Sequence, residues 1–101
     1  MEEKIEENKT AQLDQALLLQ LRKQAHLLPP LVRIGKAGLN QNILEEIGKQ
    51  LRIHHLVKIK LLKNFMDDIP LTKRELGEQI AAKTRAALVT VVGNTVVLWR
   101  N

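Results

Sequence analysis

The chain has 101 residues, with 16 Lys and Arg against 11 Asp and Glu, giving a net charge of +5. It has no cysteine, which excludes disulfides, thiolate metal sites and thiol catalysis. Phe65 and Trp99 are its only Phe, Tyr or Trp residues, so it cannot build a platform of exposed rings for stacking single-stranded bases. A chain of this length and charge predicts one domain with an anionic partner. The alternative is a protein that is basic without such a partner.

The first segment differs from the rest in charge. Residues 1–9 hold four Glu and two Lys, so the remaining chain carries +7. We expect residues 1–9 to be an acidic N-terminal extension and residues 10–101 to form a single domain. No run approaches the roughly 18 apolar residues that a membrane span needs. We expect a cytoplasmic protein that is a monomer and has no membrane partner.

The first helix is predicted over residues 10–25, where an apolar residue recurs every four positions. Basic residues cluster at the end of this helix, namely Arg22, Lys23 and His26. A favourable interaction with the helix dipole explains them, and contact with an anion is the alternative. Pro29-Pro30 then ends the helix and leads into a short strand over residues 31–34.

The stretch over residues 32–40 reads Val-Arg-Ile-Gly-Lys-Ala-Gly-Leu-Asn and predicts a strand end, a loop and a helix start. Gly35 and Gly38 leave the backbone bare, Lys36 adds a positive charge, and Asn40 is typical of a helix N-cap. Together these features favour a seat for a phosphate group. The Lys-Ser/Thr pair of a nucleotide-binding P-loop is absent. A Gly-x-x-Gly pattern alone is also typical of an ordinary strand-to-helix turn.

A second helix is predicted from residue 41 to residue 54 or 55, followed by a strand over residues 56–62. The strand alternates cleanly, with Lys58 and Lys60 on the face opposite three apolar residues. If this strand pairs beside the first, Arg33 shares a surface with the two lysines. The alternative is a solvated face without a ligand. Residues 63–69 are predicted to be a connection with turn character.

The last part of the chain predicts one helix and two strands. Thr72 and Glu75 have the spacing of a capping box, which starts a helix that runs to residue 83 or 84. Runs rich in β-branched residues over 87–92 and 95–100 flank Gly93-Asn94 and predict a hairpin. The unbroken apolar run of residues 96–99 predicts a central strand that is covered on both faces. The order of elements is helix, strand, helix, strand, helix, strand, strand, which predicts a mixed sheet with helices packed on it.

The chain resembles the CRM domain (chloroplast RNA splicing and ribosome maturation) over about residues 13–100. The resemblance lies in the Gly-Lys-Ala-Gly loop between strand and helix, the Val-Lys-Ile-Lys strand and the closing Val-Val-Gly-Asn-Thr-Val-Val-Leu-Trp-Arg hairpin. It implies an α+β, two-layer fold similar to the C-terminal domain of bacterial translation initiation factor three. In that fold a mixed four-stranded sheet has its last strand antiparallel to the others.

The resemblance also implies a function. Stand-alone members of the family are associated with precursors of the large ribosomal subunit, and plant multi-domain members support group II intron splicing. The family's loop is implicated in RNA contact, and four further positions are commonly basic. The RNA-binding residues implied here are Gly35, Lys36, Ala37, Gly38, Arg33, Lys58, Lys60 and Arg100. We therefore predict a protein that binds ribosomal RNA of the large subunit or its precursor; a stable ribosome constituent or a protein–protein interaction module is the alternative.

The titratable residues argue against an enzyme. His54 and His55 are adjacent, so they cannot share one helix face as zinc ligands one turn apart do. Asp67 and Asp68 could bind a hard cation, but no further carboxylates lie nearby in the sequence. His26 has no evident partner. We expect no catalytic residue, no metal site and no cofactor.

Overall fold

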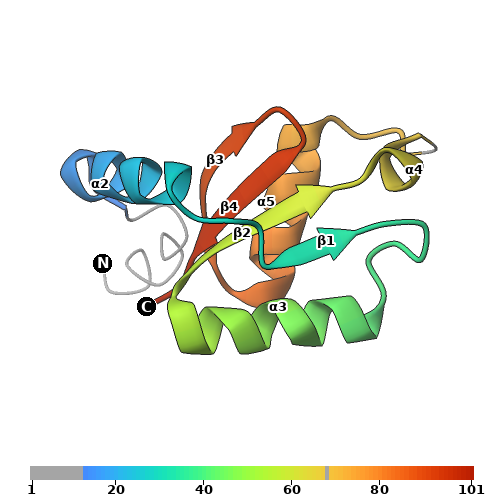
Figure 1. The fold of residues 1–101 in the computed structure, drawn as a ribbon, viewed down its shortest axis with the longest axis horizontal. Helices are drawn as coiled ribbons and strands as arrows, with labels where there is room; N and C mark the ends of the chain where they lie inside the picture. Colours follow the sequence, from blue (N-terminus) through green and yellow to red (C-terminus); the bar gives the residue numbers. More distant parts are fainter. Residues whose placement is uncertain (1–12, 68) are drawn as a thin grey trace, which may run out of the picture.

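The computed structural model describes residues 13–67 and 69–101. The helices and strands follow one another in this order: α2 (Gln15–His26), β1 (Val32–Ile34), α3 (Gln41–His54), β2 (Leu56–Leu61), α4 (Lys63–Met66), α5 (Lys73–Thr84), β3 (Ala87–Val92) and β4 (Thr95–Trp99). Figure 1 shows their arrangement. The predicted strands and the three predicted helices are all present within these residues.

The four strands form one sheet in the order β1-β2-β4-β3. β1 and β2 are parallel, whereas β4 is antiparallel to both of its neighbours, β2 and β3. The prediction of a mixed sheet whose last strand is antiparallel to the others is therefore confirmed. β4 is a central strand, and Val96, Val97 and Leu98 are all buried, as their unbroken apolar run predicts.

Helices cover both faces of the sheet. α3 and α5 bury Ile47, Leu51 and Ile80 against one face. α2 packs on the other face, where Leu21 and Ala25 join a smaller cluster with residues of β2, β3 and β4. In Figure 1, α2 lies on its own, away from α3 and α5. The α+β class is confirmed, and α2 adds a partial third layer to the two that were expected.

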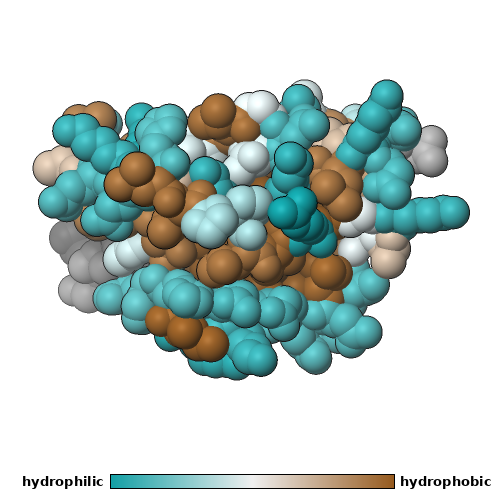
Figure 2. Space-filling model, in the orientation of Figure 1, coloured by the Kyte–Doolittle hydropathy of each residue, from teal (hydrophilic) through white to brown (hydrophobic). Residues whose placement is uncertain are grey.

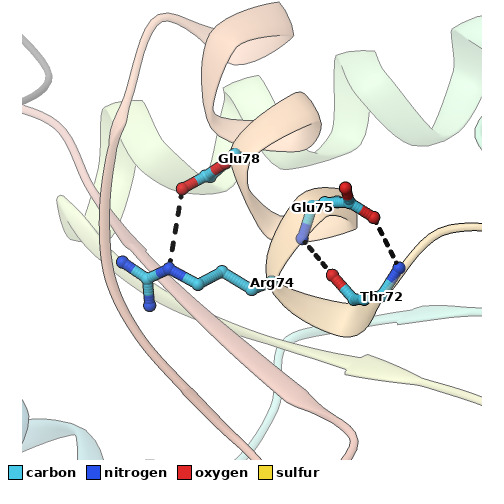
Figure 3. Close-up of polar contacts among 4 residues, drawn as sticks. All are labelled: Thr72, Arg74, Glu75 and Glu78. Atoms are coloured by element: carbon cyan, nitrogen blue, oxygen red, sulfur yellow. Dashed lines mark hydrogen bonds and ion pairs between the residues drawn. The ribbon is translucent and has the colours of Figure 1, made fainter.

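The helix starts follow from their capping residues. Thr72 Oγ1 accepts the Glu75 N–H at 3.1 Å, and Glu75 Oε1 accepts the Thr72 N–H at 2.9 Å, so the predicted capping box is confirmed (Figure 3). Figure 3 also shows the ion pair between Arg74 and Glu78 on the same helix. Each cap satisfies N–H groups that the first helical turn leaves without a partner.

Two helices differ from the sequence prediction. α2 begins at residue 15 and not at residue 10, because the Asp14 carboxylate caps it by accepting the Leu17 N–H at 2.7 Å. The part of the predicted helix before residue 13 lies outside the described residues. The predicted connection after β2 contains the short helix α4, which buries Phe65 against the core. No helix among the described residues is long and apolar enough to cross a membrane.

A β-bulge interrupts the pairing of β3 with β4. Leu88 pairs with Leu98 and Thr90 pairs with Val97, so Val89 is an extra residue without a partner. The bulge changes the alternation of side chains, because Val89 and Thr90 both lie on the face that carries α2. The apolar run of residues 87–92 gave no sign of it.

Candidate nucleic-acid interface

The Gly-x-x-Gly loop projects from the end of the sheet that holds the C-termini of β1 and β2. Lys36 and Ala37 are exposed, and both glycines are partly exposed. The Gly38 N–H donates to the Gly35 carbonyl at 2.9 Å and closes the turn. Gly38 has φ of 76°, a left-handed conformation that glycine adopts without the strain of a Cβ atom.

The loop leaves backbone donors unused. Within residues 13–67 and 69–101, no hydrogen bond is donated by the backbone N–H groups of Lys36 and Ala37. The next turn is fixed, because Asn40 Oδ1 accepts the Ile43 N–H at 2.9 Å and caps α3 as predicted. The loop therefore offers two free N–H groups and an exposed ammonium group beside a helix N-terminus, which is a chemistry suited to phosphate oxygens.

Two further cations lie side by side at the base of the loop. Arg33 of β1 pairs with Lys60 of β2 in the parallel register, and both side chains are exposed. They lie on the face opposite Val32 and Ile34, which are buried in the core. Neighbouring strands are about 4.8 Å apart, so the two side chains leave the sheet as a close pair. Arg33 therefore shares a surface with Lys60, one of the two lysines predicted to lie beside it.

Helix α4 packs against the loop and adds a cation that the sequence prediction did not include. A Cβ atom at Gly35 would lie 3.3 Å from Leu62 Cδ1 and 3.6 Å from Asn64 Oδ1, so the loop passes close to α4. Lys63, the first residue of α4, is exposed. Figure 1 shows the β1–α3 loop and α4 at the same end of the molecule, and long hydrophilic side chains project there in Figure 2.

We define the loop-edge cluster as the four cations at this end, namely Arg33, Lys36, Lys60 and Lys63. Within the part of the chain that the structure describes, none of them forms an ion pair with a carboxylate. Their charges therefore remain available to an anionic ligand. Lys63 was hard to find from the sequence because its segment gave no signal of a helix that returns to the loop.

Two of the predicted RNA-binding residues serve the scaffold. Lys58 Nζ donates to the carbonyls of Ala25 at 2.8 Å and Leu28 at 3.0 Å, so it binds the C-terminal end of α2. A cation at this end is favoured by the helix dipole and satisfies carbonyls that the last turn leaves free. Lys58 shares a face with Lys60, but two of its ammonium N–H groups are committed to the protein.

Arg100 lies away from the loop-edge cluster. It follows β4, whose last residue pairs with Leu56 at the opposite end of β2. Its guanidinium donates to the Thr84 carbonyl at 2.7 Å and to the Gly48 carbonyl at 3.1 Å, which joins α5 to α3. The structure therefore does not bring Arg100 together with the other predicted RNA-binding residues.

His55 lies at the C-terminal end of α3, away from the loop. His55 Nδ1 lies 3.0 Å from the Arg100 carbonyl, and His55 ends α3 with φ of 66°. No cluster of three or more His, Asp or Glu residues suited to a metal ion occurs among residues 13–67 and 69–101. The groups that the loop-edge cluster presents can pair with the charge of an anion and donate hydrogen bonds to it.

These features define a small α+β domain with a cationic Gly-x-x-Gly loop at one edge of a mixed sheet. The family model described as the CRS1 / YhbY (CRM) domain matches residues 13–100, and the chain belongs to this family. The chain is similar to a Bacillus subtilis protein named Probable RNA-binding protein YqeI, with 35% identity over 80 residues and 79% of each chain covered. It is also similar to a Haemophilus influenzae protein named RNA-binding protein, with 35% identity over 80 residues, 79% of this chain and 77% of that protein.

A solved structure has the same fold. The solution structure of the hypothetical protein SAV1595 from Staphylococcus aureus matches with a TM-score of 0.71 and 36% sequence identity, and the match covers 88% of each chain. The predicted family and fold are therefore both confirmed.

Proposed function

We propose that this protein is a non-enzymatic RNA-binding protein that holds the backbone of a folded RNA at the loop-edge cluster. The observation that carries the proposal is the position of the exposed Gly35–Gly38 loop beside the paired Arg33 and Lys60 side chains. The names of the relatives from Bacillus subtilis and Haemophilus influenzae support RNA as the ligand. The scarcity of aromatic residues favours binding through phosphates and shape over base stacking.

The mechanism follows from the donors at the loop. The free N–H groups of Lys36 and Ala37 contact one phosphate while the Lys36 ammonium neutralises its charge. Arg33 and Lys60 contact the next part of the backbone, where the guanidinium of Arg33 suits a bidentate contact with phosphate oxygens. KH domains use a Gly-x-x-Gly loop in a comparable way to clamp an RNA backbone.

The RNA that we propose is ribosomal RNA of the large subunit or its precursor, with a role in subunit assembly. This part of the proposal rests on the resemblance to stand-alone CRM proteins. Cosedimentation tests it in cell extracts. An assembly factor cosediments with large-subunit precursors, whereas a stable constituent remains on mature subunits in high salt. A protein–protein interaction module cosediments with neither.

A salt titration tests the loop directly. We expect the affinity for a large-subunit ribosomal RNA transcript to fall steeply with salt, with a log–log slope of about −0.7 to −0.9 for each phosphate contact. Lys36→Gln should make this slope shallower by roughly one contact. Lys83→Gln is the matched control, because it also removes one exposed lysine but lies in the last turn of α5 on the other layer.

Three results would count against this function. A flat salt response of the unchanged protein would reject backbone binding altogether. Equal effects of Lys36→Gln and Lys83→Gln on RNA affinity and on its salt slope would show that only net charge matters. The loop would then not be part of the binding site. RNA cleavage by the purified protein, with or without magnesium, would contradict a non-enzymatic role.

A further inference from the structure

A basic cleft lies between α2 and the sheet. Among residues 13–67 and 69–101, side chains from four elements line it and none of them is a carboxylate: Arg22, Ala25 and His26 of α2, Lys58 of β2, Thr90 and Val92 of β3, and Thr95 and Val97 of β4. Arg22 and His26 are one helical turn apart, and both are exposed. The threonine hydroxyls form no hydrogen bond within the described part of the chain, so they remain available to a ligand.

The bulge in β3 builds one wall of this cleft. Because Val89 is the extra residue, its carbonyl is available to Arg22, whose Nε donates to it at 3.4 Å. The contact holds the guanidinium over the sheet, and its terminal NH₂ groups donate to no other group in the described part of the chain. The same bulge puts Thr90 on the side of the cleft.

Lys58 forms part of the cleft even though it binds α2. Its ammonium donates to the carbonyls of Ala25 and Leu28, and it has one more N–H group than these bonds use. The two hydrogen bonds hold the positively charged Lys58 ammonium in the cleft and leave one N–H group for a ligand. A cation that is already held in place loses less conformational entropy when an anion binds than a free lysine does.

The cleft is continuous with the loop-edge cluster. Lys60 pairs with Arg33 on one side and with Thr95 on the other, so these three side chains form one row across β1, β2 and β4. At about 4.8 Å per strand, the row spans roughly 10 Å from Arg33 to the edge of the cleft. A single RNA strand that leaves the loop can therefore follow the row toward α2.

We propose that the cleft between α2 and the sheet is a second phosphate-binding site for the same RNA backbone. Arg22, with its guanidinium held by the Val89 carbonyl, is the principal contact. His26 and the Thr90 and Thr95 hydroxyls complete the set of donors. This inference rests on the proposed function and extends it by giving the path of the RNA. The RNA backbone runs from the loop along the row of Arg33, Lys60 and Thr95 to the C-terminal half of α2.

The test compares charge-matched variants of the full chain on one large-subunit ribosomal RNA transcript. Arg22→Gln should weaken binding several-fold and make the log–log salt slope shallower by about 0.7 to 0.9. Lys83→Gln, which removes one charge from α5, should change neither by a comparable amount. The double variant Thr90→Val and Thr95→Val removes the hydroxyls with little change of shape and should weaken binding without altering the slope. Circular dichroism melts identify any variant that fails to fold.

A second measurement does not depend on a folded variant. In NMR spectra of the unchanged protein, the amides of Thr90 and Thr95 should shift when the transcript is added, together with those of Lys36 and Ala37. Inorganic phosphate alone should cause smaller shifts at the same amides.

The outcomes separate the two proposals. If the unchanged protein shows no salt dependence, the proposed function itself fails. If Lys36→Gln weakens binding but Arg22→Gln matches Lys83→Gln, the loop site stands and the cleft is overturned. Shifts at Thr90 and Thr95 with inorganic phosphate and none with the transcript would also overturn it, because the cleft would then hold only small anions.

Discussion

At the scale of single residues, some basic side chains are exposed at the proposed RNA-binding site and others hold the fold together. Arg33 and Arg100 are the clearest pair. Arg33 is exposed on the open face of β1, whereas Arg100 donates to carbonyls of α3 and α5. In the sequence, both follow apolar residues of a predicted strand. Only the tertiary structure brings the carbonyls of Gly48 and Thr84 to Arg100.

This difference predicts that replacement by glutamine affects stability at Arg100 and RNA binding at Arg33. Arg100→Gln should lower the free energy of unfolding by about 1.5 to 3 kcal/mol, because two charge-assisted hydrogen bonds are lost. It should leave the salt slope of RNA binding unchanged. Urea denaturation and the salt titration measure the two effects.

Arg33→Gln is the matched variant for this prediction. It should change the free energy of unfolding by less than about 0.5 kcal/mol, because the side chain is exposed, and it should make the salt slope shallower. If Arg100→Gln weakened RNA binding as much as Arg33→Gln while the domain stayed stable, Arg100 would belong to the interface as the family resemblance implied.

At the scale of elements, the local signals were strong enough to predict most of the fold. Asn40, Thr72 and Glu75 are capping residues whose hydrogen bonds are local, so their sequence spacing carries the information. The alternation in β2 and the apolar run of β4 likewise predicted which faces are buried.

The elements that could not be predicted depend on distant partners. α4 has only four residues, and its position depends on the burial of Phe65 against the core. The bulge at Val89 lies in a run in which nearly every residue is apolar, so a shift of one position leaves the pattern unchanged. The loop-edge cluster was largely predictable from Lys36 and the strand alternation, whereas the cleft beside α2 depends on that bulge.

The capping box of α5 gives a prediction at the element scale. Thr72→Ala should lower the free energy of unfolding by about 1 kcal/mol, because the Glu75 N–H loses its acceptor. Glu75→Gln should cost less, since glutamine also accepts in a capping box. Thermal melts of the two variants test the order, and an equal or larger loss for Glu75→Gln would contradict it.

At the scale of the whole molecule, the charge and the sheet have separate roles. The net charge of +5 attracts nucleic acid from a distance, while the sheet decides which cations lie together. Arg33, Lys60 and Thr95 come from three strands and meet only through the strand register. The arrangement of side chains at the proposed RNA-binding surface therefore depends on the strand register.

Hydrogen exchange should reveal the order of stability within the sheet. We expect the amides of β4 to exchange most slowly, because β4 is paired on both sides and its residues 96–98 are buried. Amides of β1 should exchange faster, since this strand has three residues and lies at an edge. Faster exchange in β4 than in β1 would show that the sheet does not open from its edge.

The central place of β4 has a consequence for the order of events during synthesis. β2 and β3 are joined only through β4, which comes after both of them in the chain. A nascent polypeptide that has emerged from the ribosome only as far as Val92 has its helices but not the strand that unites the sheet. Productive folding must therefore wait for residues 95–99, and until then the unpaired sides of β2 and β3 are open to chaperones and to aggregation.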